Sequence, residues 1–171
     1  DVVYLTNPGL RTWDLVAPEN PMVRRAVAGG ITTVLLIPGS GTNMSGFGTV
    51  VRIAGRTHEE AILKAPGSLK IAQAGNPERY WFHVERAYMN FNLRQTLAKA
   101  KAYHEAWNAW EKDQTTPKPK FSVAWDYFRH LFRRDVVISV HTQIFQVFSM
   151  TITMLVDEFG LNVMPDHSDF D

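Results

Sequence analysis

The sequence predicts an α/β protein with a largely parallel sheet, because strand-like and helical segments alternate along the chain. Five segments rich in branched aliphatic residues are expected as strands: 31–37, 49–53, 68–72, 136–140 and 161–164. The first of them is apolar or β-branched throughout, which is typical of a strand covered on both faces. An open doubly wound sheet and part of a (β/α)8 barrel both fit this alternation, and the pattern does not distinguish them.

Helical segments are recognised by the spacing of their apolar residues and by their end signals. The expected helices cover 21–28, 58–64, 90–112, 122–133 and 144–159. Pro21 suits a helix start, and Thr57 with Glu60 fits a capping box. The segment 90–112 has apolar residues at three- and four-residue steps, which indicates one buried stripe.

A Gly-rich segment, 39–48, is expected as a loop. It lacks the lysine that a phosphate-binding P-loop needs, and it does not show the GxGxxG spacing of a dinucleotide-binding turn. The segment therefore predicts a turn or a flexible rim rather than a nucleotide site.

Composition excludes several classes of protein. The 171 residues suffice for one core and favour a single segment, 1–171, of one domain. Lys and Arg total 18 against 17 Asp and Glu, a net charge of +1, so a general nucleic-acid or anionic-membrane binder is not expected. The absence of cysteine excludes disulfides, thiolate metal sites and cysteine nucleophiles. No apolar run approaches the ~20 residues of a membrane span, so we expect a soluble chain whose compartment is open.

Three titratable residues lie at or near the carboxyl ends of expected strands, where parallel α/β folds collect their ligands: Lys70, His141 and His167. Imidazole is a common Zn²⁺ ligand, and two histidines from neighbouring strands can converge on one ion. Lysine becomes a ligand only as a carbamate, formed with CO₂, which can bridge two cations. The alternative is that each residue is an ordinary hydrogen-bonded side chain, and the spacing leaves both interpretations open.

Several segments, taken in order, resemble the metal-dependent amidohydrolase superfamily, with the imidazolonepropionase-like branch nearest. They are 21–34 (PMVRRAVAGGITTV), 38–43 (PGSGTN), 69–79 (LKIAQAGNPER), 90–94 (NFNLR), 140–143 (VHTQ) and 166–168 (DHS). The last two are similar to the fifth and sixth strand ends of that family. The resemblance covers nearly the whole chain.

This resemblance implies a partial (β/α)8 TIM-type barrel, roughly strands two to six with their helices, holding one or two divalent ions, often zinc. His141 and His167 would be metal ligands, and Lys70 falls where many members carry a carboxylated lysine. Gln143 and Asn43 are expected near the substrate from their positions. The implied reaction is hydrolysis of a C–N bond in an amide, cyclic amide or peptide-like small molecule.

The chain departs from the family pattern in two respects. It has no His-x-His pair, which members carry on strand one, and it ends before the strand that supplies the family's aspartate base. We therefore expect activity only when missing strands of the parent protein or another chain complete the barrel. A non-catalytic structural or interaction subunit derived from the same framework is the competing interpretation, and an unrelated open α/β binding domain is the third.

Overall fold

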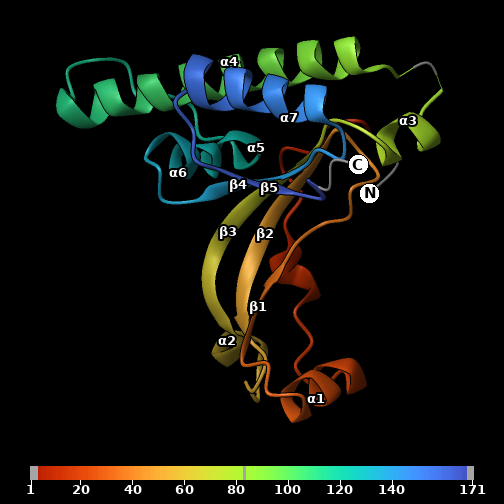
Figure 1. The fold of residues 1–171 in the computed structure, drawn as a ribbon. Helices are drawn as coiled ribbons and strands as arrows, with labels where there is room; N and C mark the ends of the chain where they lie inside the picture. The colour runs from red at the N-terminus through yellow and green to blue at the C-terminus, as the bar shows by residue number, and fades with distance from the viewer. Residues whose placement is uncertain (1–3, 83, 169–171) are drawn as a thin grey trace.

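The computed structural model describes residues 4–82 and 84–168, which form a mixed α/β fold around one curled sheet (Figure 1). Its strands, in spatial order, are β1 (Thr33–Leu36), β2 (Met44–Arg52), β3 (Ile62–Ala72), β4 (Val137–His141) and β5 (Val163–Asp166). The pairs β1–β2 and β2–β3 are antiparallel, whereas β3–β4 and β4–β5 are parallel.

The helical elements fall into two groups. The first group, which precedes β3 in the sequence, is η1 (Thr12–Leu15), α1 (Pro21–Ala28) and α2 (His58–Ala61). The second group is α3 (Asn76–Tyr80), α4 (Arg86–Lys112), α5 (Val123–Asp126), α6 (Phe128–Phe132), α7 (Phe145–Thr151) and the π-helical η2 (Ile152–Glu158). Among the described residues, no helix combines the length and the apolarity that crossing a membrane requires.

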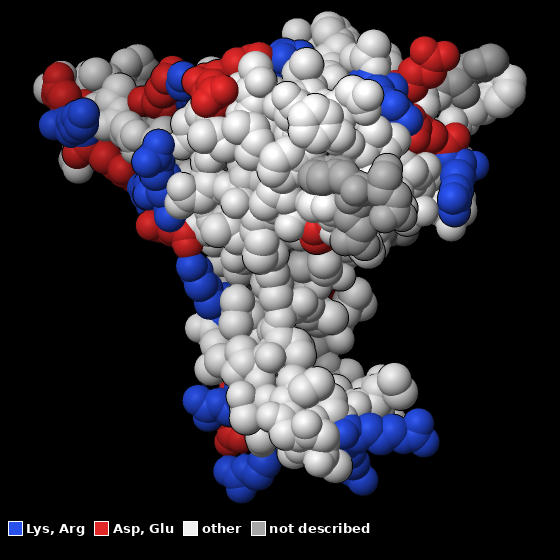
Figure 2. All heavy atoms as spheres, viewed as in Figure 1, with Lys and Arg blue, Asp and Glu red and all other residues white. Residues whose placement is uncertain are grey.

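Figure 1 shows two regions of the molecule. The helices α4 and α7 lie across the parallel part of the sheet, while a narrow stalk extends away from it. We define the stalk as β1, the adjoining halves of β2 and β3, and the helices α1 and α2 at its far end. In Figure 2, basic side chains gather at that far end on both sides of an uncharged surface.

The expectation of a parallel sheet is wrong for its first half. Only residues 37–43 separate β1 from β2, and only 53–61 separate β2 from β3. A parallel connection needs a crossover of about a dozen residues or more, so each of these strands has to return antiparallel to the one before it. The first strand is also not covered on both faces: β1 lies at the sheet edge, and its residues are exposed or half-buried.

The Gly-rich segment 39–48 is only partly a loop, because β2 begins at Met44. Gly46 lies inside β2 with a φ of 118°, and a Cβ there would come within 2.7 Å of the Leu10 carbonyl oxygen. The glycine therefore permits the N-terminal segment to pack closely against the strand. Gly46 thus allows a close backbone contact within a strand, where the sequence predicted a turn or a flexible rim.

Other boundaries shift by a few residues. The helix expected at 58–64 ends at Ala61 because β3 begins at Ile62, and the helix expected at 122–133 is divided at Tyr127. The helix expected at 144–159 continues as the π-helix η2, and the strand expected at 161–164 becomes Val163–Asp166. The long helix is confirmed and begins earlier, at Arg86.

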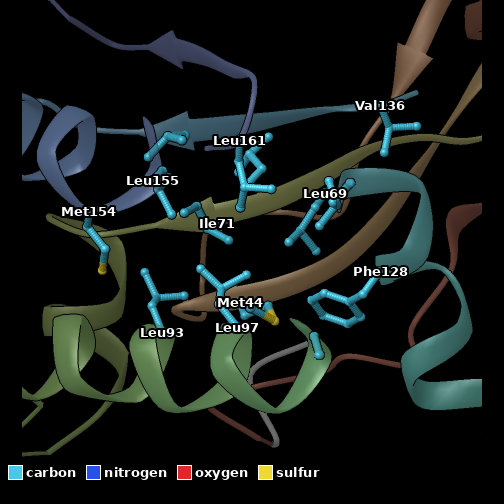
Figure 3. Packing of buried hydrophobic residues seen from close by; sticks show 14 of the residues in the cluster. Met44, Leu69, Ile71, Leu93, Leu97, Phe128, Val136, Met154, Leu155 and Leu161 are labelled. Atoms are coloured by element: carbon cyan, nitrogen blue, oxygen red, sulfur yellow. The ribbon is translucent and has the colours of Figure 1, made fainter. Parts of the chain in front are cut away.

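The apolar core lies between the parallel strands and α4 (Figure 3). The strands contribute alternate residues of one face: Leu69, Ile71, Ile138 and Val140. Leu93 and Leu97 meet them from α4, and Phe128 packs edge-on against Phe47 with ring centroids 5.1 Å apart. The residues in between, Ser68, Lys70, Ser139 and His141, are buried on the opposite face of the sheet. The parallel parts of β3 and β4 thus each have one apolar face and one polar face, and both faces are buried.

Replacing Phe128 with Ala tests this core. The side chain is fully buried, so its loss leaves a cavity, and the free energy of unfolding should fall by about 3–5 kcal/mol. Urea unfolding followed by circular dichroism measures the change. Phe91→Ala is the matched control, because Phe91 is 56% exposed and its removal should change stability by less than about 0.5 kcal/mol. Equal effects at the two positions would contradict the assignment of the core.

Candidate metal centre

The register of the parallel strands brings three carboxyl ends to one edge of the sheet. Ala72 of β3 lies opposite His141 of β4, and His141 lies opposite Asp166 of β5. His167 follows Asp166 directly. Side chains far apart in the sequence are therefore neighbours because their strands end at the same level.

His141, Asp166 and His167 form a cluster suited to a cation. One potential ligand atom from each of them lies within 4.8 Å of the others, and the two imidazole rings have centroids 4.4 Å apart. The structure thus brings together the two histidines that the sequence singled out. Their role as ligands stays a prediction.

The cluster contains buried polar atoms without hydrogen-bond partners. These are both ring nitrogens of His141 and the Oδ1 atom of Asp166. Leaving such atoms unpaired in a protein interior costs free energy, so most are paired with protein, water or an ion. One ring nitrogen from each of His141 and His167, together with the Oδ1 atom of Asp166, matches the donors that zinc takes in proteins. The residues present therefore fit a divalent cation.

Burial and neighbouring charges keep His141 in the form that binds metal. Desolvation lowers the pKa of its imidazole most, and the charges of His167 and Lys70 act in the same direction. The Gln143 side chain and the Asp166 carboxylate oppose this shift, but the pKa remains below its usual value. The Gln143 contact is not a hydrogen bond of normal geometry, since both ring nitrogens lack one. A neutral imidazole keeps the lone pair that coordination requires.

Lys70 holds the carboxylate of Asp166 from across the sheet. Its buried Nζ atom lies 2.5 Å from Asp166 Oδ2, and the Ser139 hydroxyl donates to the same oxygen at 3.1 Å. Burial acts to raise the pKa of Asp166, but the bond and charge of Lys70, helped by Ser139 and His167, lower it overall. One oxygen of Asp166 is thus occupied within the protein, and the other is the unpartnered Oδ1.

Lys70 therefore acts in this structure as a hydrogen-bond donor to Asp166. Its expected role as a carbamate ligand stays a prediction. A carbamate would place a second negative charge beside the Asp166 carboxylate, so it would need a cation between the two groups.

Gln143 lies at the rim of the cluster in a left-handed backbone conformation. Its φ is 59°, and that of His167 is 52°, a region that residues other than glycine enter rarely. The Gln143 N–H donates to the His167 carbonyl at 2.9 Å, which joins the two turns after β4 and β5. The side chain is exposed and rests over Gly75, where a Cβ would come within 2.2 Å of Gln143 Oε1. Gly75 thus leaves the space that Gln143 occupies.

Asn43 is fully buried and uses its amide group within the protein. Its Nδ2 atom donates to the Ala72 carbonyl at 2.9 Å, and its Oδ1 atom accepts from Asn92 at 2.8 Å. These bonds tie the start of β2 to the end of β3 and to α4. The substrate contact expected for Asn43 stays a prediction.

Sequence reasoning did not assign Asp166 or Ser139 to the site. Asp166 was missed because the last strand was placed at 161–164, which left the aspartate outside it. The signal was present in the alternation of residue types: Ser139 and His141 lie two apart on β4, as Ser68 and Lys70 do on β3. The same alternation predicts which face of a strand a residue lies on, but the pairing of His141 with Asp166 comes from the register of β4 and β5.

One of three comparisons with known proteins found a match, and it concerns the fold. A crystal structure of an amidohydrolase from Thermotoga maritima MSB8 superimposes with a TM-score of 0.86 over 96% of this chain, at 24% sequence identity. The fold is amidohydrolase-like. The chain spans 44% of the length of that structural neighbour. No family model and no curated protein sequence matches the chain.

Replacing Lys70 with Met tests the charge arrangement. In the native protein the Lys70 ammonium group lowers the pKa of Asp166 by more than burial raises it. Without this group the effect of burial remains, so the pKa of Asp166 should rise. A carboxyl ¹³C NMR titration measures this pKa. In the native protein the lowered pKa of Asp166 contributes stability above about pH 3.9, which is lost as the pH falls through the folded-state pKa. The variant should lose this contribution, so its free energy of unfolding at pH 7 should be lower by about 2 kcal/mol. This loss is smaller than the ~3–5 kcal/mol expected on breaking a fully buried ion pair, because the Asp166 side chain is partly exposed.

Lys99→Met is the control for removing a lysine, because Lys99 lies exposed on α4. It should leave the pKa of Asp166 unchanged. An unaltered pKa in the Lys70→Met variant would show that the ion pair does not set the charge of Asp166.

Proposed function

We propose that this chain forms the central part of a metal-dependent hydrolase that cleaves a C–N bond in an amide, cyclic amide or peptide-like small molecule. The observation that carries the proposal is the cluster of His141, Asp166 and His167, in which both ring nitrogens of His141 and the Oδ1 atom of Asp166 are buried without a hydrogen-bond partner. The amidohydrolase-like fold supports it. The imidazolonepropionase-like branch is the nearest candidate from the sequence resemblance.

Three side chains would hold one divalent ion, with zinc the best match to the donor set. The ligands are the neutral imidazoles of His141 and His167 and the free oxygen of Asp166. When bound, such an ion polarises a carbonyl and lowers the pKa of a coordinated water. Lys70 and Ser139 orient Asp166 through its other oxygen, an arrangement that outer-shell groups commonly provide to ligating carboxylates.

The protein surrounds this cluster with groups that would position a small substrate. Gln143 is exposed at the rim, where its amide group can donate to or accept from a bound amide. Asn43 would support the site indirectly, because its hydrogen bonds to the Ala72 carbonyl and to Asn92 hold the end of β3 against α4. The hydrogen bond from the Gln143 N–H to the His167 carbonyl keeps the two turns together at the same edge of the sheet.

Full activity in this proposal requires further strands beside the sheet, from the parent protein or from another chain. Among the described residues, the outer edge of β5 is paired with no strand, and β1 is paired on one side only. Additional strands along β5 would continue the sheet toward a closed (β/α)8 barrel and supply the ligands and base that this sequence lacks.

Zinc binding tests the proposal directly. After incubation with zinc and dialysis, elemental analysis of the native protein should find about one zinc per chain. Loss of a residue that only orients a ligand typically weakens metal binding by about 10- to 100-fold. His141→Ala removes a ligand itself, so it should weaken zinc binding by more than this. His58→Ala is the matched control, because His58 lies in the stalk and bonds to the Trp13 carbonyl, away from the cluster. Its zinc content should equal that of the native protein.

Unchanged zinc content in His141→Ala would exclude the ligand role. Absence of zinc from the native protein in its complete assembly would favour the non-catalytic subunit instead. Both results come from zinc content alone, so they do not depend on choosing the correct substrate.

Metal removal tests the reaction class. In the complete assembly, a chelator should abolish release of amine from a panel of cyclic amides and N-acyl amino acids, and added zinc should restore it. Asp166→Asn should lower turnover by about 100-fold or more, because the amide carries no negative charge to bind the ion or to pair with Lys70. Turnover that survives complete metal removal would contradict the mechanism.

A further inference from the structure

The stalk contains an apolar hollow that the proposed hydrolase site does not use. It measures about 200 Å³ and lies between α1, the segment 15–18 and the outer halves of β1 and β2. Its floor is formed by buried Val51, Ile53 and Ala61. Leu15 and Met22 border it and are 68% and 67% exposed, respectively. An apolar concavity with exposed apolar borders is a feature of binding sites for apolar groups.

A second, more polar hollow adjoins the first. Pro18, Val23 and Ile53 line both hollows. The second is lined in addition by Arg24 and Arg56, and Arg52 lines the apolar one. A ligand lying along both would place its apolar part on the floor of the first and its other end among arginines.

The charges at this position favour an anion. Arg24 and Arg52 are exposed, and within 4–82 and 84–168 neither makes an ion pair. Arg56 is paired with Glu60 at 3.2 Å, and Glu19 is the acidic residue that lines the second hollow. Arginines therefore exceed acids around the opening, although the whole chain has a net charge of only +1. Figure 2 shows this concentration of basic side chains at the end of the stalk.

We propose that this hollow binds a free medium-chain carboxylate, with its alkyl chain on Val51, Ile53 and Ala61 and its carboxylate between Arg24 and Arg52. The volume supports a chain of this size, since an apolar cavity of about 150 Å³ accepts a benzene-sized guest. Arginine suits the other end, because its guanidinium binds carboxylates through two parallel hydrogen bonds. The site is remote from His141 and requires no metal.

Isothermal titration calorimetry with one alkyl chain and three head groups tests the proposal. Octanoate should bind, 1-octanol should bind about two- to fivefold more weakly because it lacks the charge, and octylammonium should bind more weakly still. Hexanoate should bind about 16-fold more weakly than octanoate, at about fourfold per methylene. These measurements use the native protein below the micelle-forming concentration of octanoate.

Substitutions then locate the site. Arg24→Gln with Arg52→Gln should reduce octanoate binding to the level of octanol, and the matched double control is Arg79→Gln with Arg86→Gln on α3 and α4. Val23→Trp should fill the hollow and abolish binding of octanoate and octanol alike. Leu63→Trp is its control, because Leu63 is 46% exposed on the stalk and does not line the hollow. Circular dichroism confirms that each variant is folded.

Several outcomes would overturn the proposal. Equal affinities for octanoate and octylammonium would remove the role of the arginines. Octanoate binding that persists in the folded Val23→Trp variant would place the ligand elsewhere. Absence of octanoate binding would also overturn it, with association of two copies or binding to anionic vesicles as the competing uses of this surface. Sedimentation velocity and vesicle co-sedimentation distinguish those two. Zinc content is unaffected in every case, so failure here leaves the proposed hydrolase site untouched.

Discussion

The ion pair between Lys70 and Asp166 is the interaction on which the arrangement of the candidate site depends. It joins the first and third strands of the parallel part of the sheet across β4, where Ser139 adds a hydrogen bond to the same carboxylate oxygen. A buried lysine without such a partner would be costly. With it, the polar face of the sheet is held together, and the second oxygen of Asp166 remains free beside two imidazoles. Electrostatics within the sheet thus determines which atoms are available for a ligand.

The two faces of the sheet divide the structure between stability and chemistry. One face carries aliphatic side chains that pack on α4, and the other carries serine, lysine and histidine. This division follows from the period-two alternation of a strand, because neighbouring residues point to opposite sides. A buried strand of this kind does not look amphipathic in the usual way, since its polar residues are no more exposed than its apolar ones. Their burial is what makes them informative about function.

Sequence reasoning found the strands that carry the site because their β-branched residues and bounding glycines are local signals. The histidines at 141 and 167 were found for the same reason: each follows a recognisable strand. The antiparallel half of the sheet and the role of Asp166 cannot be predicted from local sequence signals. The antiparallel half of the sheet depends on connection lengths around β2, and Gly46 was taken for part of a loop although it lies in a strand. Asp166 was missed because its partner Lys70 is distant in sequence, and the pairing exists only once β4 lies between their strands.

The long β2–β3 hairpin divides the molecule into parts of unequal rigidity. Near the parallel strands its side chains pack against α4 and α6, whereas in the stalk it is flanked by the short helices α1 and α2 and by the half-buried edge strand β1. Local opening is easiest where few apolar groups are buried and backbone hydrogen bonds are near solvent. We therefore expect the stalk to open locally more readily than the edge of the sheet that carries His141, Asp166 and His167. Amide protons along β2 and β3 should accordingly exchange with solvent in a gradient, fastest at the α2 turn and slowest beside Leu69 and Ile71.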